Sequence, residues 1–244
     1  MRVLLKEDMT VNRCVILFVK LPEPGKVKSR LAQDMDGDMV RHLYECMVLD
    51  AIDMLERTET PFRISFDPSD AEERVRQWLG QAYSYMPQTG HDLGARMEQA
   101  FTRVFSEGVS DALLIGSDIP SLTTSIIAAA FRSFSVCDAV IGPANDGGYY
   151  LIGFKKGTFK PGIFRGMAWS TKTVFLETLG RLEKASLAVH RLPELRDIDT
   201  REDVEAYLSH ARHAEPGASR TVFFLRKHHQ ALFTRHRTIR SHNR

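Results

Sequence analysis

Cationic side chains cluster directly after an apolar run near the start of the chain. The run, residues 14–19 (CVILFV), has the length and aliphatic composition of a strand that is covered on both faces. Within eleven residues after it come Lys20, Lys26, Lys28 and Arg30. Gly25 lies among them and permits tight backbone approach, so the loop can cradle a di- or triphosphate. A solvated basic loop is the alternative, and the position after a buried strand favours phosphate binding.

Three familiar sites find no support in the sequence. The cationic loop lacks the spacing of a Walker A motif, and the chain contains no G-x-G-x-x-G, so neither a P-loop nor a dinucleotide site is indicated. Outside residues 209–244 the histidines are His42, His91 and His190, and none stands beside a serine on a strand-to-helix elbow. A Ser/His/Asp hydrolase therefore fits poorly.

Carboxylates follow two further predicted strand ends. Asp118 comes directly after the apolar run 112–115 and precedes Pro120, while Asp197 and Asp199 are two apart on an extended segment and so face the same way. Such oxygens bind Mg²⁺ or Mn²⁺ together with phosphate oxygens and water. Turn formation and helix capping are the competing roles of these aspartates, although Thr200 fills the capping role after the pair. Taken together, the three carboxylates predict a metal site.

Two glycine-containing stretches complete the set of candidate loops. Gly147 and Gly148 follow Asp146, which begins a turn into the next strand, and a plain hairpin explains this spacing equally well. Asp92 is well placed to cap a helix that has Gly94 in its first turn. Because glycine destabilises a helix at that position, we expect another segment to pack close to its backbone.

Alternating strands and helices must position these loops. The spacing predicts strands at 14–19, 63–66, 83–86, 112–115, 139–141, 149–154 and 187–192, and helices at 37–57, 70–79, 93–105, 123–134, 170–179 and 200–208. This order favours one domain of α/β class, a Rossmann-like three-layer α/β/α sandwich with a mostly parallel sheet. Ligands of such sheets bind beyond the carboxyl ends of the strands, which is where the candidate loops fall.

Five motifs in this order resemble a single family. They are Lys-x-Pro-x-Pro-Gly-x-Val-Lys-(Ser/Thr)-Arg-Leu at 20–31, Asp-Leu-Gly-x-Arg-Met at 92–97, Gly-Ser-Asp-x-Pro at 116–120, Asp-Gly-Gly-Tyr-Tyr-Leu-Ile-Gly at 146–153 and Asp-Ile-Asp-Thr at 197–200. They resemble the bacterial glycosyltransferase-A-like family (domain of unknown function 2064), called nucleotide-diphospho-sugar transferases or arsenosugar-type glycosyltransferases and related to guanylyl- and cytidylyltransferases. The resemblance covers residues 13–208.

The resemblance implies a nucleotide bound over the N-terminal half of the sheet. Its phosphates would contact Lys20, Gly25, Lys26, Lys28 and Arg30. Asp92 and Gly94 would lie near the base. The family pattern thus adds a base site to the phosphate loop that the residues themselves indicate.

The resemblance also implies a metal and an acceptor site. Asp118 would be the main ligand of Mg²⁺ or Mn²⁺, followed by Asp199 and secondarily Asp197. Gly116 stands where glycosyltransferases often have the first carboxylate of an Asp-x-Asp motif. The residues that would face the acceptor or sugar are Asp146, Gly147, Gly148, Tyr149 and Tyr150. The catalytic residues would be Asp118, Lys28 and Asp146.

Two transfer reactions fit these residues. The first hypothesis is metal-dependent glycosyl transfer from a nucleotide-diphospho-sugar to a small acceptor, in which the cations stabilise the departing nucleoside diphosphate. The second is nucleotidyl transfer of the phospholactate guanylyltransferase type, in which a nucleoside triphosphate reacts with a phosphorylated acceptor and pyrophosphate leaves. A third hypothesis is a non-catalytic nucleotide-binding protein or an RNA-binding protein that acts through its C-terminal tail.

Composition and charge exclude several other classes of protein. The composition of 43% hydrophobic and 26% charged residues is typical of a globular protein. The net charge of only +2 argues against nucleic acid as a partner. The three cysteines form no C-x-x-C pair, which argues against a disulfide scaffold. The apolar triplet at 3–5 is too short for a signal peptide, and no apolar run could span a bilayer, so a cytoplasmic protein is expected.

The net charge of +2 is the sum of two parts of the chain that carry opposite charge. Residues 209–244 carry eight Lys or Arg and one Glu, a net charge of +7, whereas residues 1–208 carry 25 basic and 30 acidic residues, a net charge of −5. We predict a transferase-like domain over 1–208 and a basic, His/Arg-rich extension over 209–244. The extension is either partly disordered or a basic amphipathic helix that docks on its own domain, a membrane or nucleic acid. Removing residues 215–244 is expected to leave catalysis intact.

Overall fold

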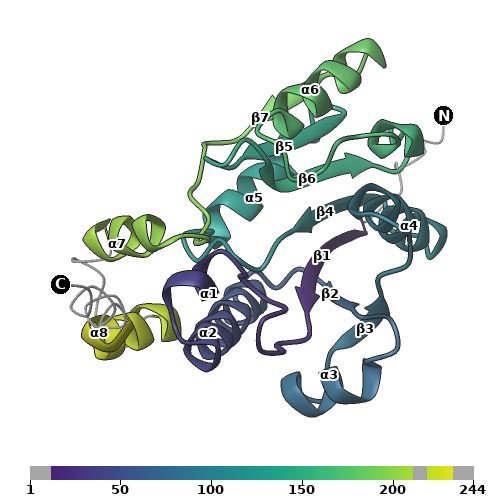
Figure 1. The fold of residues 1–244 in the computed structure, drawn as a ribbon. Coiled ribbons are helices and arrows are strands. Elements are labelled where there is room, and N and C mark those ends of the chain that lie inside the picture. Colours follow the sequence, from purple (N-terminus) through teal and green to yellow (C-terminus); the bar gives the residue numbers. More distant parts are fainter. Residues whose placement is uncertain (1–11, 211–218, 233–244) are drawn as a thin grey trace, which may run out of the picture.

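A single seven-stranded sheet organises the protein. The computed structural model describes residues 12–210 and 219–232. The strands are β1 (Arg13–Lys20), β2 (Phe62–Asp67), β3 (Ser84–Pro87), β4 (Asp111–Ile115), β5 (Ala139–Pro143), β6 (Tyr149–Lys155) and β7 (Val189–Arg191). They lie side by side in the order β3-β2-β1-β4-β6-β5-β7 (Figure 1). The predicted α/β class with a mostly parallel sheet is confirmed.

The direction of each strand determines which loops meet at one edge. β1 pairs in parallel with β2 and β4, β2 with β3, and β5 with β7. β6 is antiparallel to both of its neighbours. The loops that follow β1, β2, β3, β4, β5 and β7 therefore share the carboxyl edge of the sheet, and the turn that enters β6 lies there as well. All five candidate loops of the sequence converge on this edge.

Helices cover both faces of the sheet. They are α1 (Leu31–Asp34), α2 (Gly37–Glu56), α3 (Glu72–Leu79), α4 (Leu93–Ser106), α5 (Thr124–Ser133), the 3₁₀-helix η1 (Pro161–Phe164), α6 (Val174–Lys184), α7 (Arg201–His210) and α8 (Arg220–Leu232). The largest departure from the predicted bounds is α6, expected to begin at Ser170. Ser170 has a φ of +64°, in the left-handed region, so the chain becomes helical only four residues later.

β1 divides its side chains between two hydrophobic cores. Val15, Leu17 and Val19 point into one core with α2, α3 and α5, while Cys14 and Ile16 point into the other with α4 and α6. This alternation follows from the pleat of the strand, and it explains why the whole run 14–19 is apolar.

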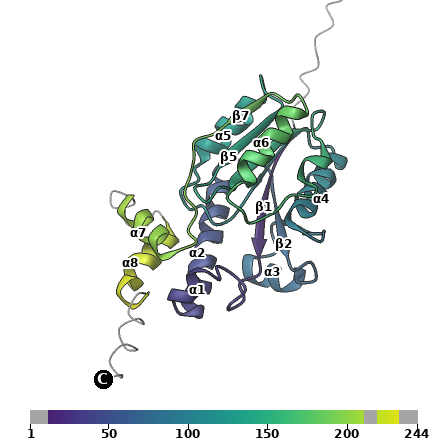
Figure 2. The same cartoon turned by 45° about the horizontal axis from the view of Figure 1, so that its top comes forward.

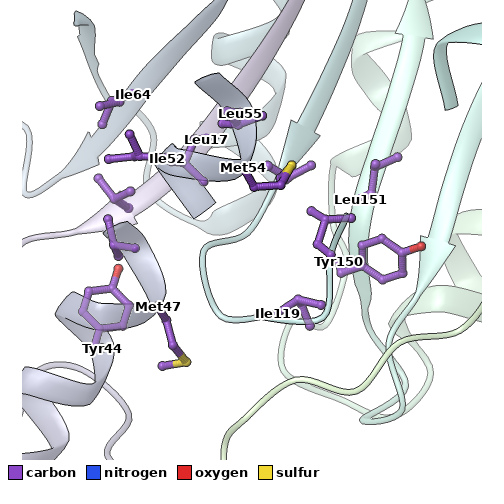
Figure 3. Close-up of a cluster of buried hydrophobic side chains, with 14 of the residues drawn as sticks. Leu17, Tyr44, Met47, Ile52, Met54, Leu55, Ile64, Ile119, Tyr150 and Leu151 are labelled. Carbon is purple, nitrogen blue, oxygen red and sulfur yellow. The ribbon is translucent and has the colours of Figure 1, made fainter. Parts of the chain in front are cut away.

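The larger core connects the sheet to the loops that carry the candidate site. Leu17 and Ile64 of the strands pack with Leu55 of α2, and the same cluster extends to Ile119 and Tyr150 at the carboxyl edge (Figure 3). The Tyr150 ring lies so close to Gly142 that a Cβ there would be 2.4 Å from it. The base of the candidate site is thus a packed part of the core.

The C-terminal helix belongs to this core as well. α8 packs against α2 and α7 (Figures 1 and 2), and its Val222 and Leu225 are buried. Of the alternatives for the basic extension, the described residues adopt a helix docked on its own domain. The remaining tail residues, 211–218 and 233–244, lie outside the described part of the chain, and the boundary at 208 stays a prediction. No helix among the described residues is long and apolar enough to cross a membrane.

Candidate active site

A buried lysine lies at the centre of the candidate site. Lys28 Nζ is 2.8 Å from Asp118 Oδ2 and 3.3 Å from Asp199 Oδ1, and the lysine side chain is 5% exposed. Arg30 Nη1 donates to the other oxygen of Asp199 at 3.2 Å. Two of the cations predicted to bind phosphate therefore meet two of the carboxylates predicted to bind a metal.

The loop between β1 and α1 carries Lys28 in an unusual backbone conformation. Gly25 turns the chain with a φ of +76°, and a Cβ there would meet no atom within 4 Å. Val27 anchors the loop in the core at 3% exposed. Lys28 itself has a φ of +49°, which costs a residue other than glycine about 1–2 kcal/mol. The loop thus combines an anchored, strained lysine with an open glycine turn that a phosphate can approach.

Asp118 is positioned through a tyrosine on α2. Tyr44, which is 5% exposed, accepts a 2.8 Å hydrogen bond from the backbone N–H of Lys20, and its hydroxyl lies 3.2 Å from Ser117 Oγ. Tyr44 therefore connects the loop after β1 to the loop after β4. The Asp118 side chain is 41% exposed, so its carboxylate faces both Lys28 and solvent.

Asp199 is held by a backbone contact and a capping box. The N–H of Ile198 donates to the Asp118 carbonyl at 3.2 Å, which brings the two loops together. Asp203 Oδ2 accepts the N–H groups of Thr200 at 2.9 Å and Asp199 at 3.2 Å, and the Asp203 N–H donates to Thr200 Oγ1 at 3.3 Å. The predicted capping role of Thr200 is confirmed, and the reciprocal bonds of Thr200 and Asp203 form a capping box that also fixes Asp199.

The cluster keeps its charges. Burial alone would lower the pKa of Lys28, but the charges of Asp118 and Asp199 outweigh burial and raise this pKa above its ordinary value. Desolvation alone would raise the pKa of Asp118, and the Lys28 ammonium reverses this, so the pKa of Asp118 lies below its usual range. The pair is therefore an ammonium and a carboxylate at neutral pH.

Asp197 behaves differently from Asp199. Its carboxyl is buried, and its pKa is raised to about 6. Burial is the main cause, and the negative charges of Asp146, Asp118 and Asp199 act in the same direction, whereas the charge of Lys28 partly opposes them. Lys28 thus contacts Asp199 directly and influences Asp197 through its charge. The two carboxylates expected to act as a pair have separate environments.

The other two lysines of the loop are exposed. Lys20 lies at the end of β1, and Lys26 forms a 2.6 Å ion pair with Glu23. Glu23 also binds Arg74 of α3 at 2.7 Å, so Lys26 is drawn toward the outer side of the loop. Contact of Lys20, Lys26 and Gly25 with phosphate stays a prediction.

A cleft of about 680 Å³ opens beside the first turn of α4. Its walls include Thr89, Gly90, His91 and Asp92 on one side and Arg165 and Gly166 on the other. Asp92 caps α4 as expected, accepting the Ala95 N–H at 2.7 Å.

Gly94 lies beside this cleft and is covered by the opposite loop. A Cβ on Gly94 would be 2.5 Å from the Phe164 carbonyl oxygen and 2.7 Å from the Trp169 ring. The expected close packing against Gly94 is confirmed. Asp92 therefore lines a cavity, while Gly94 lets the Trp169 indole pack against the first turn of α4. The proximity of Asp92 and Gly94 to a base stays a prediction.

The turn before β6 presents a carboxylate but hides its tyrosines. Asp146 is exposed and its Oδ1 accepts the Gly148 N–H at 2.8 Å, and Gly147 has a φ of +90° and lies against the backbone of residue 172. Tyr149 Oη lies 3.8 Å from Met97 Sδ, and Tyr150 Oη donates to the Pro193 carbonyl at 3.0 Å. Both phenols therefore have packing roles, and acceptor contacts for this turn stay a prediction.

Several residues that hold the loops of the site in place were not predicted from the sequence. Tyr44 and Ser117 join two site loops, and Asp203 fixes Asp199, as described above. Gln88 is 6% exposed and its Nε2 donates to the carbonyls of Val19 and Ser65 at 3.2 and 2.8 Å, which ties the ends of β1 and β2 together. A polar residue two positions after a predicted strand was the available signal for Gln88. Tyr44 gave none, because its helical spacing matched ordinary core residues.

The carboxylates fit a divalent cation that is shared with phosphates. Asp118 and Asp199 converge on one positive charge, the Lys28 ammonium. Among the described residues no group of three or more His, Cys, Asp or Glu side chains is arranged around a metal position. A pair of carboxylates is what Mg²⁺ commonly takes from a protein when substrate phosphates supply the other ligands.

The fold and this edge define a class of protein. The mostly parallel seven-stranded α/β sheet with helices on both faces matches the fold of a candidate nucleotide-diphospho-sugar transferase. The chain belongs to the family described as "Uncharacterized protein conserved in bacteria (DUF2064)", whose model matches residues 50–171.

One solved structure is a relative in sequence, and two others share the fold alone. A candidate nucleotide-diphospho-sugar transferase from Desulfovibrio desulfuricans G20 is 37% identical, with 90% of this chain and 96% of that chain covered and a TM-score of 0.86. CMP:2-keto-3-deoxy-manno-octonic acid synthetase in complex with CTP is 9% identical, with 84% and 100% covered and a TM-score of 0.54. The 4-diphosphocytidyl-2C-methyl-D-erythritol synthase from Anaerococcus prevotii DSM 20548 is 11% identical, with 82% and 96% covered and a TM-score of 0.54. A search of curated proteins gives no significant match.

Proposed function

We propose that this protein is a transferase that binds a nucleotide-activated donor at the carboxyl edge of β1 and β4 and transfers a glycosyl group to a small acceptor. The convergence of Lys28, Asp118 and Asp199 beside the open turn at Gly25 carries this proposal. The D. desulfuricans relative, a candidate nucleotide-diphospho-sugar transferase, supports the donor class.

The cations and carboxylates have complementary roles in this reaction. Lys28 and Arg30 bind the diphosphate, and exposed Lys20 and Lys26 add positive charge around it. Asp118 and Asp199, with Asp197 next to them, would hold Mg²⁺ or Mn²⁺, which supplies Lewis-acid stabilisation of the departing phosphate oxygens. Asp118 and Lys28 are thus the catalytic pair on the donor side.

The base and the acceptor have separate candidate places. The cleft beside α4 gives the nucleobase a place next to the capping Asp92, in the same turn of the helix as Gly94. Asp146, exposed on the turn before β6, is our candidate for contact with the acceptor, and Gly147 and Gly148 give that turn its shape. In glycosyl transfer the acceptor hydroxyl forms a bond to the sugar carbon while the bond from that carbon to the diphosphate oxygen breaks.

Nucleotidyl transfer is the second candidate. The fold is shared with a synthetase solved in complex with CTP and with a 4-diphosphocytidyl-2C-methyl-D-erythritol synthase. In that reaction the same cations stabilise charge at the α-phosphorus, and pyrophosphate leaves. The leaving group therefore distinguishes the two reactions.

A thermal-shift panel followed by product analysis tests the proposal. UDP-, GDP-, ADP- and CDP-sugars and the four nucleoside triphosphates are each added with Mn²⁺ or Mg²⁺, and a ligand of the folded state raises the melting temperature. Selective stabilisation by a sugar nucleotide and release of nucleoside diphosphate in the presence of acceptor support glycosyl transfer. Pyrophosphate release from a triphosphate supports the second candidate, and the absence of any shift contradicts nucleotide use.

A further inference from the structure

The Lys28 ammonium occupies the point where the two carboxylates of the site converge. It contacts both Asp118 and Asp199 within 3.3 Å, and its side chain is almost completely buried. In contrast, Arg30 is 61% exposed and contacts Asp199 alone, on the oxygen that Lys28 does not touch. Lys28 therefore neutralises the carboxylate pair, whereas Arg30 only supplements it.

We propose that Lys28 is a displaceable placeholder, whose ammonium holds Asp118 and Asp199 until a nucleotide draws it to the phosphates and a divalent cation takes its position. This inference rests on the proposed function and adds to it that the cation and the nucleotide bind cooperatively. Neither binds tightly without the other.

Electrostatics requires this dependence. Mg²⁺ and Mn²⁺ bind carboxylate oxygens at close range, about 2.0–2.1 Å for Mg²⁺, so a divalent ion between Asp118 and Asp199 would overlap the ammonium and be repelled by it. Conversely, moving Lys28 away without a replacement leaves two carboxylates facing each other without their buried cation, which is unfavourable. A nucleotide brings phosphates that accept the ammonium, and the divalent ion then replaces it at the carboxylates.

The loop has the mechanical properties for this exchange. Gly25 has open space around it, and the positive φ of Lys28 is a strained conformation of the kind that gathers at ligand clamps. Val27 stays anchored in the core, so the flexible four-carbon side chain of Lys28 moves and the loop backbone largely does not. Asp118 is partly open to solvent, which gives an arriving ion access.

Mn²⁺ binding measured by electron paramagnetic resonance tests the proposal. Wild-type protein, Lys28→Met and the control Lys155→Met are titrated with Mn²⁺ alone and then with Mn²⁺ plus UDP, GDP, ADP or CDP. Lys155 is a matched control because its ammonium also pairs with an aspartate, Asp138, at 3.4 Å. It is the last residue of β6 and lies at the opposite edge of the sheet from Lys28.

The proposal predicts a specific pattern of affinities. One of the nucleotides raises the Mn²⁺ affinity of wild type and Lys155→Met by roughly 10- to 100-fold. Lys28→Met binds Mn²⁺ alone at least about tenfold more tightly than wild type, and the nucleotide then changes its Mn²⁺ affinity little. Circular dichroism checks the fold of Lys28→Met. If this variant does not fold, the change in the Mn²⁺ affinity of wild type on adding a nucleotide tests the proposal.

Two results overturn the inference. One is tight Mn²⁺ binding by wild type that no nucleotide changes, and the other is a folded Lys28→Met that binds Mn²⁺ no more tightly than wild type. Both leave the proposed function standing when nucleotides raise the melting temperature in the thermal-shift panel. A failure of that panel would instead remove the function on which the inference rests.

Discussion

Two pairs of aspartates in this protein each share one cation, and they serve different purposes. At the carboxyl edge of the sheet, Asp118 and Asp199 share Lys28. On α2, Asp50 and Asp53 share Arg220, the first residue of α8. In each cluster two carboxylates share one cation, with Arg30 as an additional partner of Asp199, but the clusters differ in what else the carboxylates contact.

The cluster on α2 is completed by a helix end. Asp50 accepts the backbone N–H groups of Arg220 and Thr221, both at 2.9 Å, and the Ser219 hydroxyl at 2.6 Å. A carboxylate at a helix N-terminus stabilises the first turn, so Asp50 attaches α8 to the domain even without the arginine charge. At the sheet edge Asp118 depends on Lys28 and faces solvent. The Asp50 carboxylate is thus structural because backbone donors surround it, whereas we propose that the Asp118 carboxylate becomes available for a ligand when Lys28 moves away.

The largest expected effect is a loss of catalysis on Asp118→Asn. The amide keeps the shape of the side chain but lacks the negative charge that attracts a divalent cation and pairs with Lys28. We expect turnover to fall by about 100- to 1,000-fold, by analogy with the removal of one electrostatic contact in other active sites. Steady-state kinetics with the donor found in the panel measures the loss, and Asp50→Asn is the matched control, expected to remain within about threefold of wild type at 20 °C. Equal turnover of Asp118→Asn and wild type would remove Asp118 from the mechanism.

Deletion of residues 215–244 tests the other cluster. The docked helix changes the earlier expectation: catalysis is still expected near wild type at 20 °C, but the protein should lose stability, because Val222 and Leu225 are buried against the domain. We expect a loss of about 3 kcal/mol and a melting temperature lower by roughly 6–12 °C. An unchanged melting temperature would show that α8 does not contribute to the core.

A pH-dependent effect distinguishes Asp197 from its neighbours. Its pKa is about 6 in the folded protein and 3.8 in an unperturbed chain, so between these values the folded state binds the proton more tightly. The stability that this proton provides is fully present below pH 4 and is lost as the pH rises through 6. Asp197→Asn should therefore melt higher than wild type at pH 7.5, by about 2 kcal/mol of stability, with the difference vanishing near pH 3.5.

Thermal melts with a chelator present measure this difference without a bound cation. Asp146→Asn, at an exposed carboxylate on the neighbouring turn, is the matched control, with a much smaller pH dependence expected. A constant difference between wild type and Asp197→Asn at both pH values would contradict the raised pKa.

The smallest expected effect is at the cap of α8. Asp50→Ala removes the acceptor of two backbone N–H groups and one hydroxyl, which costs about 1 kcal/mol, or roughly 2–4 °C in melting temperature. Asp53→Ala, which removes only the arginine contact, should cost less. A larger loss for Asp53→Ala than for Asp50→Ala would mean that the ion pair, and not the cap, attaches the helix.

The sequence predicted the elements of the fold because the signals were local. The apolar run 14–19, the cap at Asp92 and the capping box at Thr200 each lie within one element, and the structure has all of them. The helix predicted from Ser170 began late because a left-handed residue interrupts the chain there, which a serine does not signal.

The site was harder to predict because its contacts join distant parts of the chain. Spacing identified Lys28 as one of four similar cations and did not show that this one is buried between Asp118 and Asp199, the latter 171 residues away. The attachment of α8 likewise depends on Asp50, 169 residues before Ser219. Tyr149 and Tyr150 belong to a motif, but the motif does not say that both side chains turn into the protein.

Calorimetric titration of the selected sugar nucleotide into wild type, Asp118→Asn and Asp50→Asn, each with and without Mn²⁺, tests the central claim most directly. If the Lys28 cluster is the nucleotide and cation site, Mn²⁺ strengthens binding at least about tenfold in wild type and in Asp50→Asn, and this strengthening is lost in Asp118→Asn. The same Mn²⁺-dependent affinity in all three proteins would contradict the assignment of the site to the Lys28 cluster.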